Sequence, residues 1–111
     1  MSYKIIPTEY FKTQVRTLSK DYPHIFHDLK ELSRMLKKNP KCGNPLGKKT
    51  YKIRLTNSDL SKGKRSGYRI ISYVVNEKKK IRLLTIYIKS RKINISDNEI
   101  KLILQQEGLT K

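Results

Sequence analysis

The spacing of the apolar residues changes near residue 49, and this change limits the folds open to the chain. Before it, apolar residues recur every three or four positions, as on one face of a helix. After it, they alternate with polar residues, as in a strand with one buried face. A length of 111 residues fits one domain, so we predict a single α+β domain over residues 1–111.

The first part of the chain predicts a short strand and two amphipathic helices. We expect the strand at residues 2–6 and the helices at 9–20 and 24–38, with Thr8 as N-cap of the first helix. Residues 39–48 contain Pro, Gly and Asn and are expected to form a loop. The apolar stripes of the helices are Phe11, Val15 and Leu18 in the first and Ile25, Leu29, Leu32 and Leu36 in the second.

The second part predicts three strands and a last helix. The strands are expected at 49–55, 67–75 and 81–89, and the short connections between them favour antiparallel pairing. Ser96 is the expected N-cap of the last helix, with Glu99 placed to complete a capping box. The predicted order is therefore β-α-α-β-β-β-α.

This order predicts a small antiparallel sheet with the two N-terminal helices packed on one face, together with a C-terminal helix. We expect the opposite face of the sheet to stay open to solvent. Lys52 and Arg54 should point to that open face, because Ile53 and Leu55 between and beside them are the better core residues.

The charge of the chain indicates an anionic partner. Lys and Arg number 26 against 9 Asp and Glu, a formal net charge of +17. A charge of this size attracts polyanions, so nucleic acid is the leading partner class, before an acidic protein or an anionic membrane. Mere solubility is the alternative explanation. Six cations crowd between residues 52 and 69, where Asp59 is the only acidic residue: Lys52, Arg54, Lys62, Lys64, Arg65 and Arg69.

Several functional classes lack their motifs in this sequence. We find no apolar run long enough to span a membrane and no secretory signal, and the single cysteine, Cys42, suits a reducing compartment, so we expect a cytoplasmic protein. His24 and His27 are spaced like a metal pair, but no further ligand is obviously placed to complete a site. We therefore read them as surface residues and expect neither a metal nor a cofactor.

Cations alone can catalyse one reaction in particular. RNA carries its own nucleophile, the 2′-hydroxyl group, so an enzyme need only align it, stabilise the added negative charge and move protons. A lysine among other cations can act as the base, whereas arginine stays charged. This residue set therefore suits cleavage of RNA and not of DNA.

The segments "YKIRL", "KGKRSGYR" and "LLTIYIKSR" resemble the RelE/ParE superfamily of bacterial toxins, most of all its RelE/HigB-like mRNA interferases. The resemblance covers residues 3 to about 104. It implies that Lys52 is a candidate general base and that Arg69 holds the scissile phosphate. It also implies catalytic roles for Arg54, which stands where the family has a second lysine, and for Arg91 at the end of the last strand.

The sequence departs from the family pattern in two places. The family carries a base-stacking tyrosine after the last arginine, and here that stretch is "KINISDNEI". Tyr73 or Tyr87 could replace it, or both could pack in the core. Lys89 and Lys92 flank Arg91 and are candidates for assisting it. The loop before the second strand is long and basic, which suggests contacts with ribosomal RNA through Lys62, Lys64 and Arg65, or simply a solvated loop.

The resemblance implies a type II toxin that cuts mRNA in the ribosomal A site. Its partners would be the ribosome with its mRNA and a cognate acidic antitoxin, with operator DNA bound only through the antitoxin complex. Two alternatives stay open, a ParE-like gyrase inhibitor and a basic nucleic-acid-binding module without catalysis.

Overall fold

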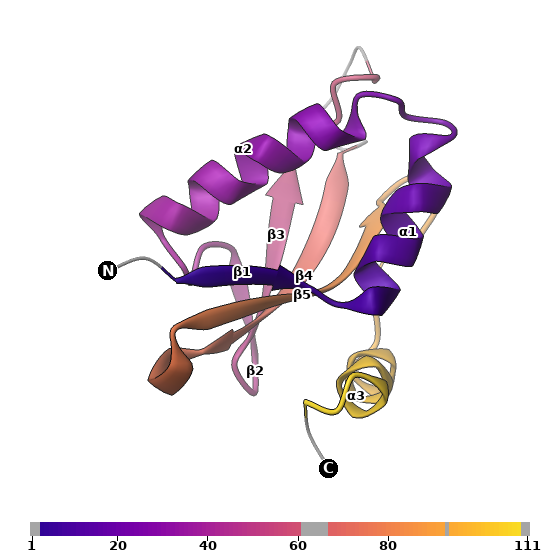
Figure 1. Cartoon of the computed structure of the whole chain (residues 1–111). Coiled ribbons are helices and arrows are strands. Elements are labelled where there is room, and N and C mark those ends of the chain that lie inside the picture. Colours follow the sequence, from indigo (N-terminus) through magenta and orange to yellow (C-terminus); the bar gives the residue numbers. More distant parts are fainter. Residues whose placement is uncertain (1–2, 61–66, 93, 110–111) are drawn as a thin grey trace.

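The computed structural model describes residues 3–60, 67–92 and 94–109, which form three helices around a five-stranded sheet (Figure 1). The strands lie in the order β1-β5-β4-β3-β2. In chain order the elements are β1 (Lys4–Pro7), α1 (Glu9–Ser19), α2 (Ile25–Lys38), β2 (Asn44–Gly47), β3 (Thr50–Leu55), β4 (Tyr68–Val75), the short 3-10 helix η2 (Asn76–Lys78), β5 (Lys80–Ile88) and α3 (Asp97–Gln106). The predicted α+β class is confirmed.

Both predicted helix caps are present. The Thr8 hydroxyl oxygen accepts a hydrogen bond from the backbone N–H of Phe11 at 3.1 Å, and the hydroxyl donates to the carbonyl of Leu83 on β5. Ser96 accepts from the backbone N–H of Glu99, whose carboxylate accepts from the backbone N–H of Ser96. The caps satisfy backbone donors that the first turn of a helix leaves free, so they fix where α1 and α3 begin.

The sheet is mixed rather than antiparallel. Strands β3, β4 and β5 form the expected antiparallel meander, but β1 pairs in parallel with the start of β5. The expected loop over 39–48 also contains a strand, since β2 pairs with the first half of β3. The sequence does not indicate β2, because Asn44–Gly47 contains Pro and Gly and all four of its residues are exposed.

The helices cover both faces of the sheet, which corrects the expectation of one open face. Helices α1 and α2 bury Phe11, Leu32 and Leu36 against Ile53 and Ile70 in the larger core cluster. Helix α3 lies on the opposite side (Figure 1), where a second cluster is formed by Ile71, Leu84, Tyr87, Ile95, Ile100, Ile103 and Leu104. The rest of that second face carries the cationic residues described below.

Among the described residues, no helix combines the length and the apolar character needed to cross a bilayer.

Candidate functional site

The register of β3, β4 and β5 brings cationic side chains together on the α3 side of the sheet. Arg54 on β3 lies directly opposite Arg69 on β4, which in turn lies opposite Tyr87 on β5. Lys52 is two residues before Arg54 and so shares its face, while Ile53 points into the larger core. The predicted orientation of Lys52 and Arg54 is therefore observed.

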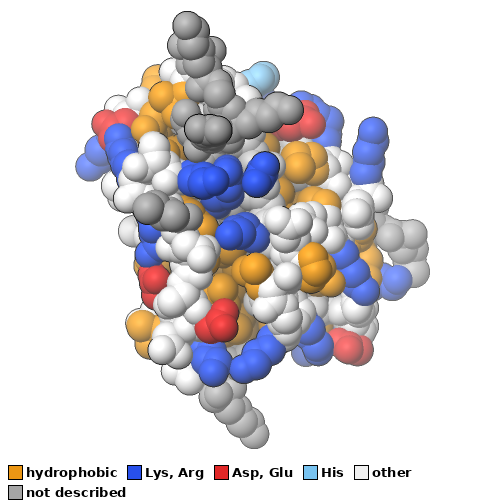
Figure 2. Space-filling model, turned by 180° about the vertical axis from the view of Figure 1, so that it is seen from behind, with side chains coloured by type: hydrophobic (Ala, Val, Ile, Leu, Met, Phe, Trp, Pro, Cys, Tyr) orange, Lys and Arg blue, Asp and Glu red, His pale blue; other side chains and the backbone are white. Residues whose placement is uncertain are grey.

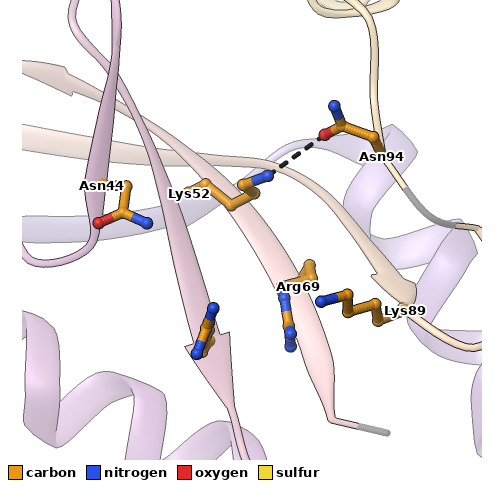
Figure 3. A pocket seen from close by; sticks show the side chains of 6 residues that line it. Asn44, Lys52, Arg69, Lys89 and Asn94 are labelled. Carbon is orange, nitrogen blue, oxygen red and sulfur yellow. Dashed lines mark hydrogen bonds between the residues drawn. The ribbon is translucent and has the colours of Figure 1, made fainter. Parts of the chain in front are cut away.

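These side chains line a pocket of about 250 Å³. Its six lining residues are four cations and two amides, namely Lys52, Arg54, Arg69, Lys89, Asn44 and Asn94. Figure 3 shows the five labelled side chains, those of Asn44, Lys52, Arg69, Lys89 and Asn94, approaching from β2, β3, β4, the residue after β5 and the segment before α3. Figure 2 shows the molecule from behind, and Lys and Arg side chains gather on part of the face that is visible there. The pocket is therefore suited to an anion.

Arg69 is the buried cation of the pocket, with only 4% of the residue exposed. Its Nη1 donates a hydrogen bond of 3.2 Å to the carbonyl of Tyr68. Burial, and then the neighbouring charge of Arg54, lower the pKa of Arg69 from its ordinary value, while Tyr87 acts in the opposite direction. Burying a charge beside a like charge is unfavourable, so an anion in the pocket would relieve an existing cost.

Lys52 is held by a neutral partner. Its Nζ donates a hydrogen bond of 3.2 Å to Oδ1 of Asn94. The two pocket amides, Asn94 and Asn44, are functional candidates that no sequence motif indicates. The only local signal for Asn94 is that it stands two residues before the N-cap Ser96, and no local signal marks Asn44.

Arg91 is engaged elsewhere. Its Nη2 lies 2.9 Å from Oδ2 of Asp21 in the connection between α1 and α2, and its guanidinium group lies 5.3 Å from the centre of the Tyr22 ring. The bond to Asp21 raises the pKa of Arg91. Lys92 likewise pairs with Glu99 of α3. The pocket thus brings together three of the four predicted catalytic residues, Lys52, Arg54 and Arg69, and also Lys89, but not Arg91.

The two tyrosines considered for base stacking pack beneath α3. Tyr87 is 8% exposed within the second core cluster, and Tyr73 is half-buried against the same cluster. Burial raises the pKa of Tyr87, and its hydroxyl has no hydrogen-bond partner among the described residues. In this arrangement Tyr87 is a core residue, and its ring does not present a face on which a base could stack.

The remaining predicted residues lie outside the pocket. Lys62, Lys64 and Arg65 fall in residues 61–66, outside the described residues. His24 pairs with Asp59 through Nδ1 at 2.6 Å. His27 lines a second cavity of about 380 Å³, which shares Arg54 with the cationic pocket. Over the described ranges, no three His, Cys, Asp or Glu side chains gather in a way that could hold a metal ion.

Comparison with solved structures supports the fold described above. No family model matches the chain. The E. coli toxin RelE, solved as a mutant in the free state, superposes with a TM-score of 0.63 over 96% of this chain and 98% of its own, at 18% identity. In the intact E. coli RelBE toxin–antitoxin complex, the matched chain gives a TM-score of 0.57 over 77% of this chain and 94% of its own, at 22% identity.

The five-stranded sheet with helices on both faces therefore defines an α+β protein of the RelE-like fold. The likeness to RelE that the sequence motifs indicated is confirmed for the fold, and it extends over almost the whole chain.

Proposed function

We propose that this protein is the toxin of a type II toxin–antitoxin pair, and that it is a metal-independent endoribonuclease which cuts mRNA in the ribosomal A site. One observation carries the proposal: four cationic side chains from three neighbouring strand segments converge on one small pocket, and one of them is buried. The RelE-like fold supports it. We expect the protein to act in the cytoplasm.

The pocket offers the groups that cleavage by the 2′-hydroxyl requires. In its neutral form, Lys52 takes the proton of the 2′-hydroxyl, and the 2′ oxygen forms a bond to the adjacent phosphorus. Arg69 and Arg54 hold the non-bridging oxygens, where negative charge accumulates. The bond from phosphorus to the 5′ oxygen breaks, and that oxygen takes a proton from a lining ammonium group such as Lys89 or from water. The products are a 2′,3′-cyclic phosphate and a 5′-hydroxyl.

An acidic antitoxin is the expected protein partner. Complementary charge would speed its association with a chain of net charge +17 and would compete with RNA for the pocket. The toxin–antitoxin assembly of the matched RelBE structure supports this part of the proposal. Contact with operator DNA would then occur only through the complex.

The proposal is tested by expressing the protein in bacteria and mapping mRNA 5′ ends. We expect growth arrest with cuts in register with the reading frame. Lys52→Ala should relieve the arrest, because it removes the proposed base from an accessible position. Arg69→Lys should also relieve it while keeping the buried charge, so that loss of folding does not explain the result. Lys38→Ala at the exposed end of α2 is the control for the loss of one positive charge.

Two placements favour a second candidate, an RNA-binding protein without catalysis. Arg91, a predicted catalytic residue, is paired with Asp21 outside the pocket, and Tyr87, a predicted base-stacking residue, is buried in the core. Binding of RNA without new 5′ ends would support this candidate. A DNA-damage response with intact mRNA would instead indicate a ParE-like gyrase inhibitor. If Lys52→Ala and Arg69→Lys arrest growth as strongly as the parent protein does, the assigned site is wrong.

A further inference from the structure

We infer that Asn94 is a positioning residue that orients Lys52, and that helix α3 acts on the pocket through it. This inference rests on the proposed cleavage reaction and extends it to a residue and a helix that the cationic motifs do not include. It starts from the hydrogen bond of 3.2 Å from Lys52 Nζ to Asn94 Oδ1, drawn as a dashed line in Figure 3.

The two residues come from distant parts of the chain and meet at the pocket. Lys52 lies in the middle of β3, and Asn94 lies in the segment between β5 and α3. Both line the pocket, and Figure 3 shows the Lys52 side chain extended toward the amide of Asn94. Lysine has a long side chain with much rotamer freedom, so an acceptor at this point selects one placement of the amine among many.

Asn94 is itself held in place by α3. The next residue, Ile95, is buried among the core residues beneath the helix. Ser96 then caps the helix in a reciprocal arrangement with Glu99, and Glu99 also pairs with Lys92 before the segment. The docking of α3 on the sheet therefore decides where the amide of Asn94 stands.

An amide suits this position better than a carboxylate. The amide oxygen accepts a hydrogen bond from the amine without adding negative charge to a pocket that must receive a phosphate. A carboxylate would form an ion pair with Lys52, hold it in the charged form and repel the RNA backbone. An alanine would leave the lysine side chain free to move. The orientation of the amine would be lost, but the charge of the pocket would not change.

These differences predict separate kinetic effects. Phosphate binding depends mainly on Arg69 and Arg54, so Asn94→Ala should lower the rate of the chemical step by about three- to tenfold while changing the RNA concentration at half-saturation little. Asn94→Asp should lower the rate by at least about tenfold, weaken RNA binding and move the rising limb of the pH–rate profile to higher pH. Asn94→Gln keeps the amide and should recover most of the activity.

The experiment measures single-turnover cleavage of mRNA on programmed ribosomes over a range of pH, with Asn98→Ala in the first turn of α3 as the matched control. A second measurement does not depend on activity. The order parameter of the Lys52 ammonium group, read by NMR, should exceed that of the exposed Lys30 in the parent protein and fall to the same level in Asn94→Ala.

The measurements distinguish failure of the positioning role of Asn94 from failure of the proposed function. If the parent protein cleaves and all Asn94 variants match Asn98→Ala in rate and pH profile, the positioning role is wrong and the proposed function stands. If the parent protein does not cleave, the proposed function fails, and the NMR measurement still decides whether Asn94 orders Lys52. Equal order parameters for Lys52 and Lys30 in the parent protein would overturn the inference in either case.

Discussion

Arg54 and Arg69 face each other directly across β3 and β4. Like charges at such a cross-strand position destabilise a sheet by a few tenths of a kcal/mol to about 1 kcal/mol. The exposed Arg54 therefore lowers the stability of the free protein while contributing to an anion site. Stability given up at a binding site is a common result of selection for function.

Replacing Arg54 should separate these two effects. We expect Arg54→Gln to raise the free energy of unfolding by about 0.5 kcal/mol, because it removes the repulsion from Arg69. The same change should weaken binding of single-stranded RNA. Urea unfolding and a binding titration measure the two quantities, with Arg16→Gln on α1 as the control. A stability loss in Arg54→Gln would show that the guanidinium group makes favourable contacts that outweigh the repulsion.

His24 and Asp59 form a pH-dependent contact between the start of α2 and the segment after β3. Nδ1 of His24 lies 2.6 Å from the carboxylate of Asp59, which also accepts from the backbone N–H of His24. The side-chain hydrogen bond raises the pKa of His24 and lowers the pKa of Asp59. The protonated histidine is therefore favoured in the folded state.

The two pKa shifts make the stability of the folded protein depend on pH. The contribution of His24 to the free energy of unfolding is fully present below its unfolded pKa of about 6.5. It is lost as the pH rises through the higher pKa of the folded state. That of Asp59 is present above its unfolded pKa and is lost as the pH falls through the lower folded value. We expect His24→Gln to cost more thermal stability at pH 5.5 than at pH 8.5. His27→Gln, one turn along the exposed surface, is the matched control for loss of an exposed imidazole.

At the level of elements, the connection from α2 into β2 passes very close to β3. Gly43 has a φ of 100°, and a Cβ atom there would lie 2.4 Å from the carbonyl oxygen of Lys52. Only glycine allows both this backbone conformation and this approach. The position matters to the site, because Asn44 follows immediately and lines the pocket.

Two glycine substitutions separate the energetic cost of backbone strain from that of a steric clash. Gly43→Ala should lower the free energy of unfolding by about 2–4 kcal/mol, because backbone strain and a steric clash act together. Gly108→Ala also has a positive φ, 70°, but its Cβ would meet nothing within 4 Å. It should therefore cost only about 1 kcal/mol. Urea unfolding of both variants measures the difference, and equal losses would mean that the backbone near Lys52 shifts without cost.

At the level of the whole molecule, a net charge of +17 acts on folding and on binding in opposite directions. Repulsion among the cations opposes the compact state, so salt should stabilise the fold by screening it. Binding to RNA releases counterions, so salt should weaken it. The four pocket cations alone would give a slope of about −3 in a plot of log affinity against log salt concentration for single-stranded RNA.

Raising NaCl from 50 to 500 mM should therefore increase the urea midpoint and decrease affinity for RNA and for 70S ribosomes. Both are measured on the same protein preparation, by unfolding and by filter binding. A binding slope near zero would contradict the role assigned to the cations. A midpoint that does not rise with salt would mean that the positive charges are too far apart to repel one another appreciably.

The features that depend on neighbouring residues could be predicted from the amino-acid pattern alone. The helical stripes, the caps at Thr8 and Ser96 and the alternation that turns Lys52 and Arg54 away from the core are all local, because spacing along the chain fixes direction within a helix or strand. The α+β class followed from these elements, since their apolar faces must cover one another.

Which distant residues meet depends on how the elements pack, and this could not be predicted from local patterns. The parallel pairing of β1 with β5, the packing of α3 on the second face and the pairing of β2 depend on contacts between remote segments. For the same reason, the sequence did not indicate that Asn94 would reach Lys52, or that Asp21 would hold Arg91 away from the pocket. Spacing along the chain determines which way a side chain points, but tertiary packing determines which distant residue it contacts.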